Sequence, residues 1–260
     1  MDLDKSALKL IDLQNLLTKP FDLSKMNVEY NNFLNILEFE FGNKTRGITG
    51  FHPHRVNCFQ FLFGCLQKTL KDNFVNFQKW LIDSFEIIYE RTTAINTWGI
   101  LLNIIRNPQH TAEKKAIGAC FSYLATVEGF FERDLKICYS LMELSKGNYV
   151  DINELEKYEI ADIKGFLENE NVDFLFQGWN RNLRNAIAHF SFKWDNINNQ
   201  LTFRDHYFNK FKKNWTDWKK SYSLNQLIDI NQKAVNVNQA VTTMFAIMDI
   251  QDCCYGNRRA

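Results

Sequence analysis

Proline and glycine are scarce along this chain, and that scarcity constrains its fold more than any other feature. The 260 residues include 3 Pro and 11 Gly, whereas 45% are hydrophobic and 23 are Phe. Proline and glycine interrupt regular structure, and turn-rich β-sandwiches need many of them. The sequence therefore predicts an all-α protein with a large apolar core, at a length that one domain with an elaborated extension can reach.

Apolar residues recur at three- and four-residue intervals through most of the chain, which is typical of amphipathic helices. Pro20 and Pro108 mark places where a helix must end or begin. We expect an N-terminal helical region of unknown role over 1–110 and a helical-bundle domain over 111–260. The predicted helices cover 3–17, 31–41, 55–70, 73–90, 93–105, 111–145, 171–189 and 223–252. The acidic segment 151–173, which follows the helix predicted over 111–145, has room for a short helix.

The pattern changes directly after residue 189. Polar and apolar residues alternate over 190–195 and again over 201–204, on either side of the turn cluster 196–199. Alternation around such a turn is typical of a β-hairpin. We therefore expect a small two-stranded hairpin after the helix that ends at His189.

Charge, cysteine and hydropathy patterns exclude several classes of protein. The formal net charge of +1 gives no overall attraction to nucleic acid, so RNA binding would need a local patch. The six cysteines form no CxxC pair and are expected to be reduced thiols. No basic leader and no apolar run long enough for a membrane helix occur, so we expect a cytoplasmic protein. His52 and His54 flank Pro53, where a loop before a helix explains the pattern better than a metal site.

One stripe of the helix predicted over 171–189 is apolar, which indicates that this face packs on a core. Its members are Trp179, Leu183, Ala186, Ile187 and Phe190.

Arg181, Arg184 and Asn185 share the opposite, polar face, with His189 one turn beyond Asn185. Two guanidiniums and an imidazole suit a phosphate ligand. Arg184 and His189 are about 7.5 Å apart along the axis and roughly 140° apart around it, so one copy presents them on different sides. A two-fold homodimer would bring two arginines and two histidines into one cleft.

A structural alternative explains the same residues without chemistry. Arg181 and Arg184 can be solvated cations near a helix end, and His189 can cap the C-terminus. The spacing RxxxxH alone favours this interpretation, because so short a pattern is common.

The residues around that spacing carry more information. Arg184–His189 reads RNAIAH, lies on a helix late in a helical chain and precedes a predicted hairpin. This closely resembles the Rx4-6H signature of the HEPN (higher eukaryotes and prokaryotes nucleotide-binding) family, in which a polar residue follows the arginine. The resemblance covers the motif and, loosely, residues 111–252. It implies a four-helix core, a homodimer across the motif helices, and cleavage of single-stranded RNA in antiviral defence or as a toxin.

The resemblance also implies a role for each motif residue. Arg184 would hold the scissile phosphate, His189 would transfer a proton, and Asn185 would orient His189 or bind the phosphate. Since the 2′-hydroxyl of RNA is itself a nucleophile, no metal or other cofactor is expected. Toxins of the family that are paired with a nucleotidyltransferase antitoxin often carry tyrosine two positions after the histidine, where this chain has Ser191. That regulation is in doubt, although an antitoxin or regulatory protein stays among the expected partners.

Basic and aromatic residues are interleaved over 204–222. Basic side chains bind phosphates and aromatic rings stack on unpaired bases, so this stretch is a candidate RNA guide. Lys210, Lys212 and Lys213 are the expected phosphate contacts there, and Arg181 is expected to add another. The alternative is that the aromatic rings pack beneath a loop while the lysines stay in water.

Two rival functions stay open. The chain can be a non-catalytic HEPN-like module that binds nucleotide or RNA, or that docks to a partner protein. It can also be a structural helical protein in which RNAIAH arose by chance. A cleavage assay separates the enzyme from the first rival, and the oligomeric state bears on the second.

Overall fold

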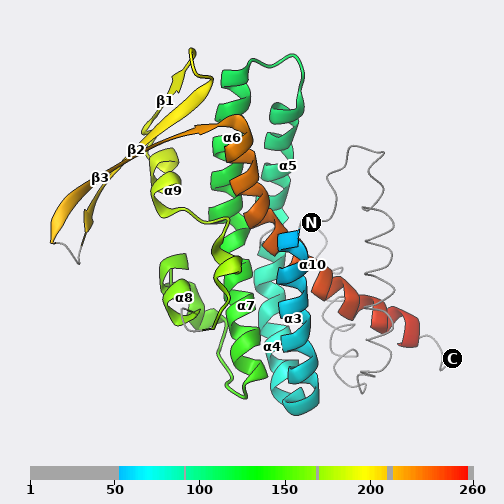
Figure 1. The fold of residues 1–260 in the computed structure, drawn as a ribbon. Coiled ribbons are helices and arrows are strands. Elements are labelled where there is room, and N and C mark those ends of the chain that lie inside the picture. Colours follow the sequence, from blue (N-terminus) through cyan, green and yellow to red (C-terminus); the bar gives the residue numbers. More distant parts are fainter. Residues whose placement is uncertain (1–52, 91, 168–169, 210–212, 257–260) are drawn as a thin grey trace. The chain divides into compact units, whose positions relative to one another are not determined.

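The computed structural model describes residues 53–90, 92–167, 170–209 and 213–256. These residues are mostly helical and carry one small antiparallel sheet (Figure 1). The helices predicted over 3–17 and 31–41 lie outside the described residues. Three predicted helices are confirmed as α3 (Pro53–Asp72), α4 (Phe74–Glu90) and α5 (Thr92–Arg106).

The described residues pack as two units, each assembled from separated segments. The first contains 53–86, 136–157 and 239–256, and the second contains the described parts of 87–135 and 158–238. The sequence predicted one boundary after residue 110, whereas these units are discontinuous along the chain. Trp80 is fully buried in the first unit and its Nε1 donates to Ser140 Oγ at 2.8 Å. The second unit carries the whole RNAIAH motif.

The helix predicted over 111–145 is confirmed, but its middle turn is wider than an α-helix. It comprises α6 (Ala112–Thr126), a π-helical turn η2 (Val127–Phe131) and α7 (Glu132–Ser145). Thr111 caps its start by accepting a hydrogen bond from the Lys114 backbone at 3.2 Å. A Cβ on Gly129 would lie 2.3 Å from Ala94 Cβ, so glycine lets this turn lie against α5. π-helical turns often mark functional positions.

The acidic segment contains a 3-10 turn η3 (Asn153–Lys157) and the short helix α8 (Ile160–Leu167). Beyond it, the single helix predicted over 171–189 is wrong. A 3-10 turn η4 (Asp173–Phe176) and an irregular stretch precede α9 (Arg181–Ala188), which has only 8 residues. Gly178 explains the break, because a Cβ there would lie 2.2 Å from the backbone nitrogen of Ala234.

The predicted hairpin exists, but a third strand extends it. The strands β1 (Phe192–Asp195), β2 (Gln200–Asn209) and β3 (Asn214–Ser223) form an antiparallel sheet in the order β1-β2-β3. The third strand was missed because aromatic and basic residues occupy both faces of 214–223, which obscures the alternation. One face of the sheet packs on the core through Leu201, Phe203 and Tyr222.

The last helix, α10 (Leu224–Gly256), confirms the prediction over 223–252. Asn231 on α10 donates to Ser122 Oγ on α6 at 2.9 Å, and both side chains are buried. α5 packs along α6, while α9 packs against β2 and α6 (Figure 1). Among the helices that the structure describes, none combines the length and apolar character of a membrane span.

Candidate functional site

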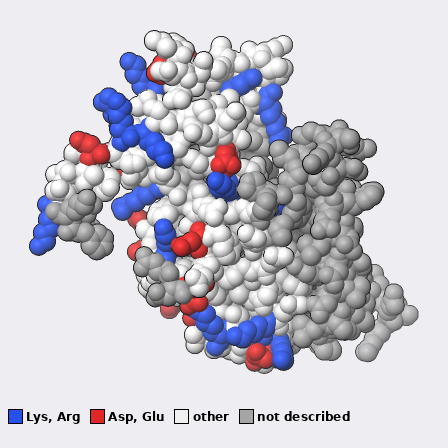
Figure 2. All heavy atoms as spheres, in the orientation of Figure 1, with Lys and Arg blue, Asp and Glu red and all other residues white. Residues whose placement is uncertain are grey.

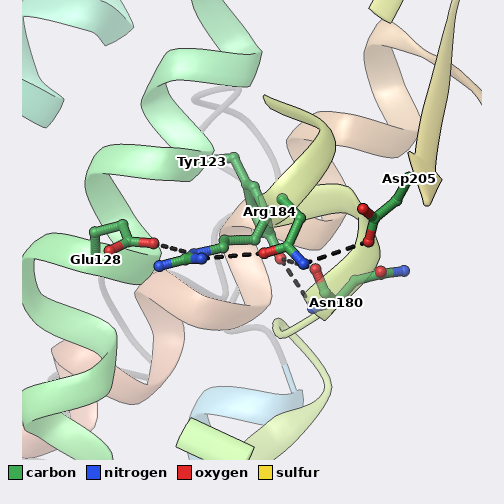
Figure 3. Close-up of polar contacts among 6 residues, drawn as sticks. Tyr123, Glu128, Asn180, Arg184 and Asp205 are labelled. Atoms are coloured by element: carbon green, nitrogen blue, oxygen red, sulfur yellow. Dashed lines mark hydrogen bonds and ion pairs between the residues drawn. The ribbon is translucent and has the colours of Figure 1, made fainter. Parts of the chain in front are cut away.

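The start of α9 is held by two buried tyrosines from other elements, of which Figure 3 shows Tyr123. Asn180 caps the helix, since its side-chain oxygen accepts from the Leu183 backbone at 3.0 Å. The Asn180 backbone N–H donates to the Tyr123 hydroxyl at 2.9 Å, and its amide nitrogen donates to the Tyr222 hydroxyl at 3.3 Å. Burial raises the pKa of Tyr123, so its hydroxyl stays protonated. The cap therefore ties α9 to α6 and β3.

The apolar stripe of the motif helix is confirmed in its middle and wrong at one end. Leu183, Ala186 and Ile187 are all at most 1% exposed, which locks one face of α9 onto the core. Trp179 precedes the helix and is half-buried. Phe190 is 70% exposed, because the chain has already left the helix at that position.

Arg184 lies on the opposite face and bonds to a carboxylate from the π-helical turn (Figure 3). Its Nε donates to Glu128 Oε1, and its Nη1 donates to Asn185 Oδ1 at 3.0 Å. The Arg184 and Glu128 side chains are 40% and 41% exposed, so water and solutes reach the pair. The hydrogen bond that Arg184 donates to Glu128 raises the pKa of Arg184, and the charges of Glu128, Glu159 and Glu132 add to this. The guanidinium is permanently charged and sits among carboxylates.

Asn185 continues this chain of contacts to the sheet. Its amide nitrogen donates to Asp205 Oδ2 on β2 at 3.3 Å. The amide is therefore bonded to Arg184 and Asp205, and not to His189 as one of its two expected roles would need. Glu128, Arg184, Asn185 and Asp205 thus form one line of polar contacts, of which Figure 3 labels Glu128, Arg184 and Asp205.

Glu128 and Asp205 are the site residues that sequence reasoning missed. They are 56 and 20 positions from the α9 residues that they contact. No local spacing signals such long-range contacts. The π-helical turn that presents Glu128 could not be expected from helical periodicity either.

His189 ends α9 as its C-cap, with φ −94° and ψ 9°. The Phe190 N–H donates to Ile187 O at 3.0 Å and the Ser191 N–H donates to Ala186 O at 2.7 Å. These two bonds form a Schellman motif, with Phe190 in the left-handed region at φ 55°. The His189 side chain is exposed, and no hydrogen bond joins its ring to any residue within the described ranges. An exposed imidazole at a helix end is free to reach a ligand.

Of the four expected RNA contacts, the structure describes Arg181 and Lys213, and these two lie on different elements. Arg181 is the first residue of α9 and is exposed. A cation at a helix N-terminus meets the positive end of the helix dipole, so the structural alternative, a cation that the dipole favours, is wrong for Arg181. Lys213 is exposed at the β2–β3 turn, and Figure 1 shows that hairpin reaching away from α9. Lys210 and Lys212 lie outside the described residues.

Comparisons with protein families, with curated proteins and with solved structures find no match to this chain.

Proposed function

We propose that the chain is a metal-independent endoribonuclease that cuts single-stranded RNA as a homodimer, through Arg184, Asn185 and His189. The observation that supports this most is the arrangement of α9. Its apolar face is fixed in the core while Arg184 and His189 stay accessible to solvent. Catalytic side chains must be held in place and still reach the substrate, because a small displacement of a catalytic group lowers the reaction rate steeply.

The proposed reaction uses only the RNA itself and these residues from two copies. The 2′-oxygen of a ribose attacks the adjacent phosphorus and loses its proton, while the 5′-oxygen of the next nucleotide leaves and gains one. His189 from either copy serves as the proton donor or acceptor, and Arg184 stabilises the charge that builds on the phosphoryl oxygens. The products are a 2′,3′-cyclic phosphate and a 5′-hydroxyl end.

Two copies together supply the second proton-transfer group that one copy lacks. The motif of each chain holds one histidine, His189, and so one proton-transfer group, whereas the reaction uses both an acid and a base. The roughly 140° that separates Arg184 from His189 around a helix also favours pooling residues from two chains. We infer a HEPN-like four-helix core around these paired helices, acting in the cytoplasm in antiviral defence or as a toxin that a partner protein restrains.

The ion pair with Glu128 sets a condition for RNA binding. Glu128 competes with a phosphate for Arg184, because its carboxylate already accepts from Nε and repels a second anion beside the guanidinium. Because the pair is about two-fifths exposed, it contributes little to stability, of the order of 1 kcal/mol or less, and a diester can displace it.

The test is cleavage of single-stranded RNA in EDTA. We expect His189→Ala and Arg184→Ala each to lower the rate at least about 100-fold, the usual contribution of a proton-transfer group or charge stabiliser. Light scattering after size exclusion should show that both variants keep the dimer. Unchanged cleavage in either variant, or cleavage that stops in EDTA, contradicts the proposal.

One observation favours the non-catalytic alternative. Arg184 is already bonded to Glu128 and Asn185, as a structural residue would be. A module of that kind would bind RNA or nucleotide, yet the RNA would show no new ends on a denaturing gel.

A further inference from the structure

The outward side of the sheet presents a second set of groups suited to nucleic acid. Because side chains alternate along a strand, the residues that do not pack on the core share one surface. We call this surface the outer face of the sheet. Its members are Lys193, Asp195, Gln200, Thr202, Arg204, His206, Trp215, Asp217, Lys219 and Ser221.

The middle of the outer face is cationic. Arg204 on β2 lies directly opposite Lys219 on β3, and both are exposed. Directly opposed side chains have Cβ atoms about 5 Å apart, so two like charges there repel each other and cost stability. Lys193 on β1 lies opposite Thr202, one diagonal step from Arg204. Figure 2 shows Lys and Arg side chains gathered at the upper left, where the sheet lies in Figure 1.

The carboxylates of the outer face have partners of their own, Asp195 at one end of the face and Asp217 one same-face step from Lys219. Asp195 accepts from the turn backbone at Ile197 and Asn198, at 2.9 and 3.1 Å. Asp217 bonds to His206 Nδ1 at 2.6 Å. Neither neutralises the opposed pair Arg204 and Lys219, for which no ion pair occurs within the described part of the chain. A nucleic-acid strand, whose phosphates are regularly spaced, is a ligand that would relieve this repulsion.

An aromatic platform adjoins the cationic middle. The ring of Trp215 stacks on that of His206, with centroids 4.7 Å apart and an angle of 3° between the planes. Trp215 is nevertheless 62% exposed, so a wide aromatic surface still faces water. Unpaired bases stack on such surfaces, whereas the bases of a duplex are already stacked on one another.

The outer face also adjoins the motif. The Arg204 N–H donates to Ser191 O at 2.9 Å, and the Ser191 hydroxyl donates to His189 O at 3.4 Å. Arg204 is therefore linked through Ser191 to the end of α9. We propose that the outer face is a binding track for single-stranded RNA, with Lys193, Arg204 and Lys219 on phosphates and Trp215 stacked on a base. The choice of RNA rests on the proposed function.

The test compares two neighbouring lysines that point to opposite faces. Lys220 lies opposite Phe203 on the packed side, with its Nζ 5.0 Å from the centroid of Tyr222. In a His189→Ala background, which leaves the RNA intact, we measure binding of a fluorescent oligouridylate in EDTA at several salt concentrations. Arg204→Gln with Lys219→Gln should weaken binding at least about 10-fold and lower the salt slope by about 1.4, which is two single-strand phosphate contacts. Lys220→Gln should stay within about twofold of its parent.

Two further arms sharpen the test. Trp215→Ala should weaken binding about 5-fold or more, with little change in salt slope, because stacking is not ionic. A duplex of the same length should bind less tightly than the single strand. Thermal unfolding of the Arg204 and Lys219 double variant should be no lower than that of its parent, since the substitutions remove a repulsion.

The proposal is overturned if the double variant binds like Lys220→Gln, or if duplex and single strand bind equally. Failure of the nuclease is a separate result. If the chain never cuts RNA but the double variant loses RNA binding, the binding track is supported and the nuclease function is not. If the double variant cuts RNA at the same rate as its parent, the nuclease function is supported and the binding track is not.

Discussion

Arg184 is the side chain on which the proposed chemistry depends most, and its partner Glu128 decides how available it is. Both side chains are about two-fifths exposed. Glu128 raises the pKa of an arginine that is charged at any accessible pH, so pH cannot switch Arg184 itself. Competition between Glu128 and an RNA phosphate therefore controls how readily Arg184 binds RNA.

Replacing Glu128 by glutamine tests that competition. Glu128→Gln removes the negative charge but keeps a hydrogen-bond acceptor for Arg184. We expect RNA to bind about 2- to 5-fold more tightly, because an exposed ion pair contributes no more than about 1 kcal/mol. Fluorescence anisotropy in the His189→Ala background measures the change.

Glu159→Gln is the matched control for charge alone. Glu159 acts on Arg184 only through its charge, without a hydrogen bond to it. Its substitution should change RNA affinity less than Glu128→Gln does. Equal effects, or weaker binding by Glu128→Gln, would mean that Glu128 positions Arg184 and does not compete with RNA.

Phe190, directly after the motif, adopts a strained backbone conformation. It holds the left-handed position of a Schellman motif, which glycine usually occupies, at φ 55°. Its ring contacts those of Phe121 and Phe192, with centroids 5.7 and 6.4 Å away. These contacts offset a conformation that costs of the order of 1 kcal/mol, and they direct the chain from His189 into β1.

At the scale of elements, α9 depends on its surroundings. A helix of 8 residues is too short to be stable alone in water. Its stability comes from the Asn180 cap, the buried face and the sheet that bonds to Asn185. The close approach of Gly178 to α10 sets where this helix can begin.

Two glycine substitutions separate close approach from ordinary helix propensity. Gly178→Ala would place a Cβ 2.2 Å from the Ala234 backbone nitrogen, so the irregular segment before α9 must shift. We expect a loss of at least about 2 kcal/mol in the free energy of unfolding. Gly165→Ala on α8 meets no atom within 4 Å and should gain up to about 1 kcal/mol.

Urea unfolding followed by circular dichroism measures both values. RNA cleavage by Gly178→Ala should also fall, because α9 carries Arg184 and His189. If the two variants are equally stable, the segment before α9 does not pack tightly against α10.

At the scale of the whole molecule, buried acidic groups predict sensitivity to alkali. Burial raises the pKa of Cys58 and of Cys120 from 9.0 to about 12, and these thiols lie in different units. Burial also raises the pKa of Tyr123. In the unfolded chain these groups lose their protons at lower pH than in the folded chain. Their stabilising contribution is thus complete below pH 9 and is lost as the pH rises from about 9 toward 12.

We expect the free energy of unfolding to fall above pH 9, by up to about 1.4 kcal/mol per pH unit for each thiol. Urea titrations at several pH values, under reducing conditions, give this slope. Thiol reagents should label Cys58 and Cys120 slowly at pH 8 unless the chain is unfolded. A flat profile between pH 9 and 11, or rapid labelling, would show that these thiols are accessible.

The sequence by itself determined the helices that are long and periodic, the hairpin after residue 189 and the residues of the RNAIAH motif. Periodicity suffices there, because burying one face of a long helix outweighs other local preferences. Only the tertiary structure decided where α9 begins, that 214–223 is a strand, and that Glu128 and Asp205 contact the motif. Each of these depends on groups far apart along the chain, such as Gly178 against Ala234 and Arg184 against Glu128, and no local pattern encodes such contacts.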